Sequence, residues 1–493
     1  MRATLAAAAL LAAVPAAAPA DTRPFTVPAV RGWHATGGTE RLAAHPRVVA
    51  LAGASRAEAR KLAHDLGGST TARARPGDVV LAHRGGLGAE AYVLRIGRTF
   101  RIEASAPAGW FYGGRTLLQL GGRQVPRGVA RDAPAFRERG LMIDVGRRFY
   151  PRAWLAARIR ELAGLKLNLL HLHLSDDQGF RIESTTHPEI VSADHLSKAD
   201  VRALLKVARR NHVTIVPEID MPGHMTAALA KHPDLQLKDI AGQPQPDKLD
   251  VTLPAARRFV AQIVGEELKL FSGPYWHAGA DEYLGAFSTA ADFDRYPQLA
   301  AFAQKKFGPD ANGHDAVQDF VNTVGAQIRA AGKRMRVWSD GIPGGSKVSL
   351  MPGAVVEWWE NRVSQTPAEI AAAGHDVLNV GWWPLYYVNG SPLSGLRSTE
   401  ADFYEQWQPW RFEGPYTTRW AGDATVSPPD AELPRTDHHL LGATLAVWND
   451  GPTDPAGAPG TLPSGIGPRL RILAQKTWGS KPLTASYADF AAH

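Results

Sequence analysis

The sequence predicts an α/β protein, a (β/α)8 barrel preceded by a small α+β domain. Two observations lead to this prediction. After Arg139, apolar runs that resemble strands alternate with amphipathic helical stretches, the pattern of parallel strands joined by crossover helices. Before that point, the chain shows short runs of period-two alternation and few helical signals. We therefore assign residues 21–135 to the α+β domain and residues 136–493 to the barrel.

The first twenty residues have the features of a cleavable export signal. Arg2 supplies a positive charge, residues 3–14 form an apolar run, and Ala18-Pro19-Ala20 resembles a small-residue cleavage site. The run is shorter than the roughly 20 strongly apolar residues of a membrane span. An uncleaved anchor or an N-terminal helix is the alternative. We expect residues 1–20 to be a signal peptide, the protein to be secreted, and no later segment to span a membrane.

The composition excludes several classes of function. The chain of 493 residues contains no cysteine, so it forms no disulfide and uses no thiolate chemistry. Lys and Arg number 55 against 48 Asp and Glu, a formal net charge of +7. This excess is thinly spread and forms no block of the kind that binds nucleic acid. We expect no nucleic-acid partner, and the sequence does not indicate an oligomeric state.

The clearest elements of the N-terminal domain are two strands and one helix. Residues 92–96 and 99–103 alternate between apolar and polar side chains, as strands do. Residues 115–120 are predicted to form a short helix, because glycine pairs precede and follow them. The segment 126–134, which contains Pro, Arg and Asp, is predicted to be the linker to the barrel.

The barrel prediction depends on eight strands, at residues 141–145, 168–174, 213–219, 275–280, 335–338, 354–358, 377–380 and 442–448. Helices with apolar residues at i, i+3, i+4 and i+7 are predicted at residues 154–165, 201–210, 255–270, 316–331, 367–373 and 468–478. A doubly wound open sheet is the alternative fold. Such a sheet often carries a Gly-rich phosphate turn after its first strand, and Val145-Gly146-Arg147-Arg148 does not resemble one.

Carboxylates and aromatic side chains occur together at the carboxyl ends of the predicted strands, where barrel active sites form. A single Trp there is usually part of the core, and a single Asp usually caps a helix, but here several strand ends carry both types. Aromatic rings stack on the CH faces of a sugar, and charged groups bind its hydroxyls. The strand ends therefore indicate a carbohydrate site, and they hold Arg147, Asp176, Asp177, Asp220, His224, Asp281, Glu282, Trp338, Asp340, Trp358, Trp359, Glu360, Trp382, Trp383, Tyr386, Tyr387, Trp448 and Asp450.

A metal-dependent barrel is an alternative, because His171 and His173 lie on one face of the second strand and Asp220 and His224 could add ligands. An amidohydrolase-type site would place its His-x-His on the first strand and further histidines after strands five and six, where this chain has tryptophans. We therefore expect no catalytic metal and no cofactor, and we expect His171 and His173 to form hydrogen bonds within or beside the barrel.

Five segments match the motifs of one family: residues 144–149 (DVGRRF), 168–179 (NLLHLHLSDDQG), 217–224 (PEIDMPGH), 277–282 (HAGADE) and 446–450 (AVWND). On these segments the sequence resembles glycoside hydrolase family 20, the β-N-acetylhexosaminidases, over nearly the whole chain after the leader. The resemblance implies a retaining hydrolase that has no nucleophile of its own. In this mechanism the 2-acetamido oxygen of the substrate attacks the anomeric carbon and forms an oxazolinium intermediate.

The resemblance also implies roles for individual residues. Glu282 would be the general acid that protonates the leaving oxygen and later the base that activates water. Asp281 would bind the acetamide N–H, which orients the internal nucleophile and stabilises positive charge. Arg147 and Asp450 would hold hydroxyls of the terminal sugar, so that an analogue without them binds poorly.

The remaining implied roles concern the surroundings of the reacting groups. Asp176 and His224 would support the site as a pair, with Asp220 nearby. A tyrosine of the seventh strand would donate its hydroxyl to the acetamido oxygen, where charge develops. Three tryptophans would enclose the acetamido methyl group and exclude water; they are Trp338, Trp359 and Trp448.

Two positions depart from the family pattern. Many members carry Tyr-x-Asp after the seventh strand, and the nearest match here is Tyr387-Val388-Asn389. This spacing favours Tyr387 as the hydroxyl donor, with Tyr386 as the alternative, and replaces an Asp contact to the sugar by Asn389. The acid after the eighth strand is Asp450 where many relatives have Glu. Both departures affect recognition at C4 and C6 of the sugar and leave the cleavage chemistry unchanged.

The resemblance therefore predicts exo-hydrolysis of terminal β-linked GlcNAc, or of GalNAc, from chitin fragments or other N-acetylhexosamine-containing oligosaccharides and glycans. One alternative is a lacto-N-biosidase-like enzyme, which needs a wider pocket because it releases a disaccharide. A second alternative is a carbohydrate-binding barrel that has lost catalysis. The presence of both Asp281 and Glu282 argues against the second alternative.

Overall fold

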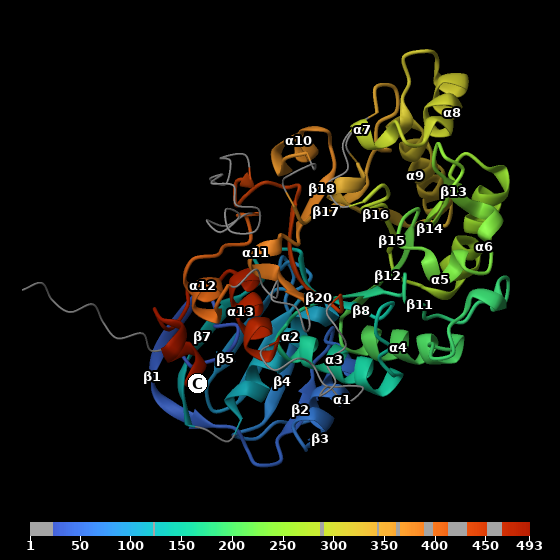
Figure 1. The fold of residues 1–493 in the computed structure, drawn as a ribbon. Helices are drawn as coiled ribbons and strands as arrows, with labels where there is room; N and C mark the ends of the chain where they lie inside the picture. The colour runs from blue at the N-terminus through green and yellow to red at the C-terminus, as the bar shows by residue number, and fades with distance from the viewer. Residues whose placement is uncertain are drawn as a thin grey trace, which may run out of the picture.

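The computed structural model describes residues 23–121, 124–285, 290–342, 345–360, 365–388, 398–412, 431–450 and 466–493. These residues form an N-terminal sheet with two helices, packed beside a closed barrel (Figure 1). The predicted signal peptide, residues 1–20, lies outside the described residues, and so does Asn389. Within the described ranges, no helix has the length and apolar character needed to cross a membrane.

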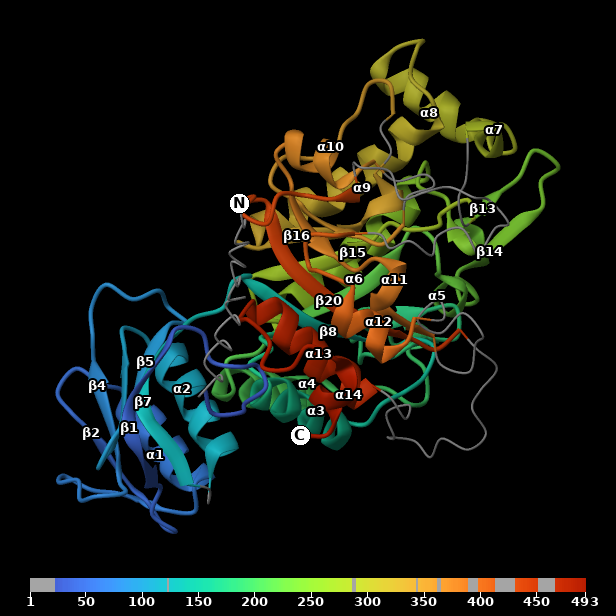
Figure 2. The same cartoon turned by 90° about the vertical axis from the view of Figure 1, so that its left-hand side faces the viewer.

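The N-terminal sheet has seven strands in the order β1-β7-β5-β6-β4-β2-β3. Two helices lie on the side of this sheet that is turned toward the barrel (Figure 2). The strands are β1 Trp33–Arg41, β2 Arg47–Ala50, β3 Ser69–Thr70, β4 Val79–His83, β5 Tyr92–Ile96, β6 Phe100–Ala104 and β7 Gln124–Asp132, and the helices are α1 Arg56–Asp65 and α2 Pro107–Leu120.

Helix α2 is longer than the helix predicted at residues 115–120, because its glycines serve close packing and do not break the helix. A Cβ atom added to Gly113 would lie 2.5 Å from Ile102 Cγ2. One added to Gly109 would lie 2.4 Å from the carbonyl oxygen of Ala91. The absence of side chains therefore lets the helix approach the sheet closely, and the expectation that the glycine pair starts the helix is wrong.

The prediction of a linker at residues 126–134 is also wrong, since most of this segment is strand β7, which lies between β1 and β5. Pro126 is compatible with this strand because β5 pairs only with residues 128–132 of β7. Pro126 faces only β1, beside an irregularity in the register. A proline that lacks the N–H donor is tolerated at such a position.

Eight parallel strands close the barrel, because β18 pairs with both β17 and β20. Each of the eight predicted strands is present within a few residues of its expected position. They are β8 Glu138–Asp144, β9 Leu169–His173, β12 Thr214–Met221, β15 Tyr275–Gly279, β16 Arg334–Trp338, β17 Val355–Trp358, β18 Asp376–Asn379 and β20 Leu440–Trp448. The sequence prediction of a (β/α)8 barrel is confirmed.

Helices surround the barrel, and local sequence explains several of their starting points. Ser197 and Asp200 form a capping box at α4, and Asn312 and Asp315 form one at α9. The long helices are α3 Arg152–Gly164, α4 Lys198–Arg210, α6 Pro254–Leu270, α8 Pro297–Phe307, α9 Gly313–Ala330 and α13 Ile466–Trp478. Shorter ones are α5 Thr226–Leu229, α7 Ala290–Phe293, α10 Pro367–Ala372, α11 Trp382–Leu385, α12 Glu400–Glu405 and α14 Tyr487–Ala491.

The loops at the carboxyl ends of the strands carry small additional elements. Strands β10 Ser175–Asp176 and β11 Gly179–Phe180 form a hairpin after β9. Strand β19 Tyr386–Val388 pairs in parallel with β20. The others are β13 Gln236–Lys238, β14 Pro244–Leu249 and the 3-10 helices η1 Pro188–Ile190, η2 Pro233–Leu235 and η3 Ser339–Gly341.

Polar contacts join the N-terminal sheet to the barrel. The indole N–H of Trp478 donates to Asp132 Oδ1 at 2.8 Å, and Lys166 Nζ lies 3.2 Å from Asp132 Oδ2. Lys166 is fully buried and also lies over the Trp478 ring. Since a buried cation is costly unless it is paired, Asp132 is needed where the two parts meet.

Candidate active site

The predicted site residues come together at the carboxyl ends of the barrel strands. Arg147 follows β8, Asp176 lies in β10 and His224 follows β12. Asp281 and Glu282 follow β15 after a single residue, Ala280. Aromatic side chains come from the next strands around the barrel, and they are Trp338, Trp359, Tyr386 and Trp448.

The backbone that carries the two carboxylates has an unusual conformation. Ala280 has φ +80° and Glu282 has φ +46°, which side chains other than glycine rarely adopt. With His224 at +53°, three of the five described non-glycine residues with positive φ belong to this site. Strained backbone of this kind often occurs at functional sites, where the surrounding structure enforces it.

The neighbouring residues that enforce this turn are identifiable. A Cβ atom at Gly279, which has φ +67°, would lie 1.7 Å from Asp220 Oδ1, so only glycine fits between β15 and β12. The backbone N–H of Glu282 donates to Asp340 Oδ2 at 2.8 Å. Asp340 therefore fixes the residue that would perform proton transfer.

A chain of charged side chains runs from Arg147 to Glu282. Arg147 Nη1 lies 2.9 Å from Asp176 Oδ2, and Asp176 Oδ1 lies 3.4 Å from His224 Nδ1. His224 Nε2 lies 3.3 Å from Glu282 Oε2 and 3.8 Å from Asp281 Oδ2. The imidazole of His224 thus connects a buried carboxylate to both carboxylates at the end of β15.

Opposite charges favour the ionised forms of two members of this chain, Asp176 and His224. Burial alone would raise the pKa of Asp176, but the charge of Arg147 and the hydrogen bond from His173 hold it well below its usual range. Burial alone would lower the pKa of His224, but its contacts with Asp176, Asp177 and Glu282 raise it well above the usual value. His224 is therefore protonated at neutral pH.

A second group of carboxylates behaves in the opposite way. Burial raises the pKa of Asp281 well above its usual range, and the nearby charge of Asp220 raises it further. Burial also raises the pKa of Asp220 to about 8, against the opposing effect of His224. Burial and the proximity of Asp281 raise the pKa of Asp340. Carboxylates this close cannot all ionise in a dry site, so the group favours a positively charged or N–H-donating ligand.

Aromatic rings form the wall beside these carboxylates. The Trp338 and Trp448 ring centroids are 5.7 Å apart, and the Tyr386 ring lies 5.8 Å from Trp448. Trp359 and Tyr386 are stacked, with an interplanar angle of 8°. The indole N–H of Trp359 donates to Asp340 Oδ1 at 2.8 Å. The rings are therefore packed against one another, and Trp359 is also held to the carboxylate group.

Asp450 lies at the edge of the site. Its Oδ1 atom is 2.8 Å from Arg147 Nε, and its side chain is 46% exposed. Arg147 lies over the Trp448 ring at 5.2 Å and is itself largely buried. The pair can offer a guanidinium and a carboxylate to neighbouring sugar hydroxyls, and hydrogen bonds to such charged groups are stronger than those between neutral groups.

Comparison with known families agrees with this geometry. Residues 136–481 match the model of the glycosyl hydrolase family 20 catalytic domain, and residues 23–133 match domain 2 of the same family. The chain belongs to glycosyl hydrolase family 20. Family 20 membership classes it among the glycoside hydrolases and explains the five sequence motifs together.

Three relatives illustrate the range of family 20. A lacto-N-biosidase of Bifidobacterium bifidum is 28% identical over 96% of this chain, which spans only 41% of that relative. A beta-N-acetylhexosaminidase of Cellulomonas fimi is 28% identical over 82% of this chain and 77% of its own length. The solved structure of the GH20 beta-N-acetylhexosaminidase from Streptomyces coelicolor A3(2) superposes with a TM-score of 0.70 at 25% identity, and covers 94% of this chain and 93% of that one.

The structure corrects the choice between the two family 20 tyrosine candidates. In the pairing of β19 with β20, Tyr386 is opposite Ala446, and Tyr387 is opposite Val447. Tyr386 and Ala446 lie in the apolar cluster of the barrel interior, with the site tryptophans. Tyr387 packs on the opposite face, against the main core. Because side chains alternate along a strand, the expectation that Tyr387 faces the site is wrong, and Tyr386 takes this position.

Two residues that sequence reasoning left without a role, Asp340 and Glu218, connect the site to the barrel interior. Glu218 accepts from the indole N–H of Trp338 at 2.7 Å, and its other oxygen lies 2.5 Å from His173 Nδ1. His173 Nε2 lies 2.7 Å from Asp176 Oδ2. A carboxylate in the middle of a mostly apolar strand could have signalled Glu218. Its partner Trp338 is far away in the chain, so sequence alone does not reveal the contact.

The hydrogen bonds predicted for His173 are present, to Glu218 and Asp176. For His171 the prediction is not met, because neither ring nitrogen has the geometry of a hydrogen bond and its contact with Glu218 is an ion-pair contact. His171 Nε2 is 3.0 Å from Glu218 Oε2, and Arg336 forms ion pairs with Glu357 and Glu138 below this layer. Several buried histidine and carboxylate atoms here lie close enough together to ligate a metal. Arg147 pairs with Asp144 and Asp176, and Arg336 pairs with Glu138 and Glu357, so these guanidinium groups supply positive charge to four of the carboxylates in this region.

Proposed function

We propose that this chain is a retaining exo-β-N-acetylhexosaminidase that removes terminal β-linked GlcNAc, with GalNAc as a further substrate to be tested. The observation that carries this proposal is the arrangement of Asp281 and Glu282. They are adjacent residues on a strained turn, and both contact His224. Adjacent carboxylates are poorly placed to flank the glycosidic bond, one as acid and the other as nucleophile. The substrate-assisted route, in which the acetamido oxygen attacks the anomeric carbon, therefore fits better.

Glu282 is proposed as the general acid and base. It lies within reach of protonated His224, and its backbone is fixed by Asp340. In the first step it would donate a proton to the leaving oxygen. In the second step it would accept a proton from the attacking water, the reverse transfer on the same face.

Asp281 is proposed to orient the acetamido group, which is the internal nucleophile, and to stabilise its positive charge. The acetamide N–H would donate to its carboxylate, while Tyr386 would donate to the acetamido oxygen. The mutual repulsion among Asp281, Asp220 and Asp340 would be relieved as positive charge develops on the oxazolinium ring. This is stabilisation at the place where charge appears in the transition state.

The aromatic wall and the Arg147–Asp450 pair are proposed to select the sugar. Trp338, Trp359 and Trp448 would enclose the acetamido methyl group, and a sugar without this group would leave the space unfilled. Arg147 and Asp450 would hold the ring hydroxyls, so a deoxy analogue would lose kcat/KM.

The proposal is tested by hydrolysis of 4-nitrophenyl β-GlcNAc, with NMR of the first product formed. Release of the β-anomer, inhibition by the thiazoline analogue of the intermediate, and no release from 4-nitrophenyl β-glucose are expected. Initial formation of the α-anomer would contradict the retaining mechanism. We also expect full activity after treatment with EDTA, because no step assigned to these residues uses a metal.

A lacto-N-biosidase activity is the second candidate, and two observations favour it. The relative of that name matches 96% of this chain. Asp450 is one methylene shorter than glutamate and is held toward Arg147, so we infer that it would leave room above the sugar. Comparison of 4-nitrophenyl β-lacto-N-bioside with 4-nitrophenyl β-GlcNAc distinguishes the two. Exclusive release of the disaccharide would replace the first candidate, and release from neither would refute both.

Export and a role in chitin or glycan breakdown are further proposals. Export is supported by the charge of Arg2, the apolar run and the small-residue site ending at Ala20. Sequencing of the N-terminus of the protein recovered from culture medium tests it. A mature N-terminus near Asp21 is expected, and retention of the whole protein in the cell would contradict it.

The natural substrate is tested by comparing release from chitobiose and from glycans that end in β-GlcNAc.

A further inference from the structure

Two histidines and a glutamate converge on the outside of the barrel, among residues with no role in the proposed mechanism. His187 precedes η1, Glu189 lies within it, and His232 precedes η2. His187 Nδ1 and His232 Nε2 each lie 2.9 Å from the same oxygen, Glu189 Oε1. The two rings meet edge to face with centroids 5.8 Å apart.

We propose that His187, Glu189 and His232 form a binding site for a divalent transition-metal ion, with Zn²⁺ as the preferred ion. Two imidazoles and one carboxylate make a donor set that zinc takes in proteins, with water in the fourth position. The three atoms lie within 4.8 Å of one another, so one ion can reach all three after small movements. Glu189 is 41% exposed on its side chain, which leaves an open path for the ion and for a water ligand.

The backbone presents the two histidines in nearly the same way. Each is followed by proline, in the sequences His187-Pro-Glu-Ile and His232-Pro-Asp-Leu. Their φ/ψ angles are −135°/63° and −133°/60°, and each starts a 3-10 turn. The two side chains therefore leave backbones of the same conformation.

Helix α6 provides the support that a metal site requires. His187 Nε2 lies 2.9 Å from Gln262 Oε1, and a ligating histidine commonly has such a partner on its other nitrogen. The rings of His187 and His232 both pack on Phe259, at 4.6 and 4.7 Å. Phe259 and Gln262 are three residues apart on α6, so one helix face fixes the orientation of both rings.

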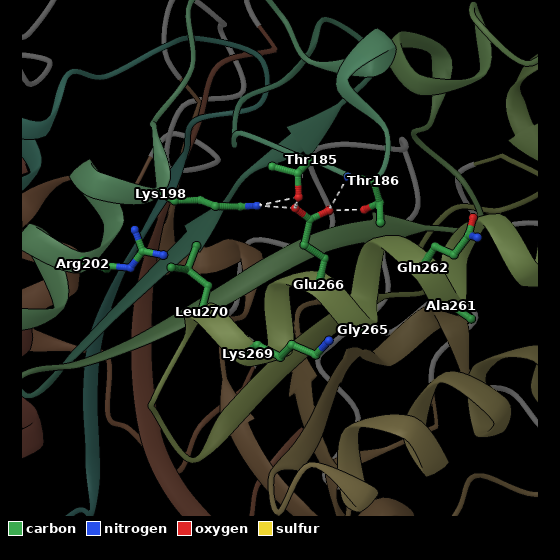
Figure 3. Close-up of a pocket in the computed structure, with 10 residues that line it drawn as sticks. All are labelled: Thr185, Thr186, Lys198, Arg202, Ala261, Gln262, Gly265, Glu266, Lys269 and Leu270. Carbon is green, nitrogen blue, oxygen red and sulfur yellow. Dashed lines mark hydrogen bonds and ion pairs between the residues drawn. The ribbon is translucent and has the colours of Figure 1, made fainter.

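The loop before His187 is also held to α6, as Figure 3 shows. Glu266, one turn beyond Gln262, accepts from the backbone N–H groups of Thr185 and Thr186 at 2.6 and 3.0 Å. Its carboxylate also pairs with Lys198. The ligand His187 is therefore next to a segment with fixed backbone, which reduces the entropy lost on metal binding.

The ion would join two loops that are otherwise connected by few polar contacts near this point. His187 and Glu189 belong to the loop after β11, and His232 belongs to the segment after β12 and α5. A bound ion stabilises the folded chain by an amount that depends on its concentration relative to Kd. The expected consequence is a rise in the temperature of thermal unfolding with Zn²⁺, independent of glycosidase turnover.

The alternative is a histidine–carboxylate hydrogen-bond network that binds no ion, and the test separates the two. Protein without a histidine tag is freed of metal by chelation and dialysis and then titrated with Zn²⁺ by calorimetry. The variants are Glu189→Gln and His232→Ala, with Gln262→Ala for the supporting contact. The matched control is His64→Ala, which removes an exposed histidine 3.4 Å from a single carboxylate, that of Asp65.

We expect saturable binding that Glu189→Gln and His232→Ala each weaken by more than about tenfold, and Gln262→Ala by roughly tenfold. The control variant is expected to bind as the parent does. Zn²⁺ should raise the unfolding temperature of the parent and the control but not of Glu189→Gln, and circular dichroism establishes that each variant is folded. Binding that persists unchanged in Glu189→Gln and His232→Ala, or no saturable binding by the parent, would overturn the proposal. Neither readout depends on the proposed hydrolase activity.

Discussion

The neighbouring tyrosines of β19 offer a matched test of the proposed site, because Tyr386 and Tyr387 differ mainly in the face on which they lie. Tyr386 is on the same face as the site tryptophans, and Tyr387 is on the opposite one. Burial and the charges of Asp281 and Asp340 raise the pKa of the Tyr386 hydroxyl well above its usual range. It therefore stays a proton donor across the working pH range, next to the carboxylate proposed to orient the acetamide.

The expected magnitude follows from the geometry of Tyr386. Its ring is stacked on Trp359 at 6.0 Å and packs on Trp448 at 5.8 Å, so phenylalanine retains the ring position. Only the hydroxyl is lost in Tyr386→Phe. Removal of one preorganised donor at a developing oxyanion costs about 10²–10³ in kcat, or about 2.7–4 kcal/mol. Tyr387→Phe removes a hydroxyl from the other face and should change kcat by less than about twofold on the same reasoning.

The assay is steady-state hydrolysis of 4-nitrophenyl β-GlcNAc by the parent and both variants at one pH. The loss in Tyr386→Phe should appear in kcat more than in KM, since the hydroxyl acts at charge that develops during reaction. Both variants should unfold at nearly the parent's temperature. A larger loss of kcat in Tyr387→Phe than in Tyr386→Phe would refute the assignment of the inward face to Tyr386.

Three further predictions follow from the site and the core. Glu282→Gln should lower kcat by about 10²–10⁴ while calorimetry still detects GlcNAc binding; an unchanged rate would remove its assigned role. The raised pKa of His224 keeps its imidazole protonated until the pH rises through that pKa. Because Asp176 contributes to the raised pKa, Asp176→Asn should lower it and move the alkaline limb of kcat/KM to lower pH. An alkaline limb that does not move would contradict this prediction. Gly113→Ala, whose Cβ would meet Ile102, should lower the free energy of unfolding by about 1–3 kcal/mol without loss of kcat, and unaltered denaturant unfolding would count against the packing argument.

The barrel could be predicted from sequence because its information is local. Each strand is a short apolar run, and the apolar residues of each helix recur with the period of the helical turn. Neither pattern requires knowledge of distant residues. The glycines of α2 misled this reasoning, since the same residue type breaks a helix in one setting and permits close packing in another. Two residues decide between these settings for Gly109 and Gly113: Ala91, which directly precedes β5, and Ile102, which lies in β6.

The sequence by itself determined the fold class, the adjacent pair Asp281-Glu282 and the aromatic and charged residues at the strand ends, because contiguous motifs and strand positions carry them. The tertiary structure decided which tyrosine faces the site and which groups hold Glu282 and Trp338 in place. The direction of a side chain in β19 depends on its pairing with β20, and the contact of Glu282 with Asp340 joins residues that follow different strands, β15 and β16. Such contacts form only when the barrel closes, and no local pattern in the chain encodes them.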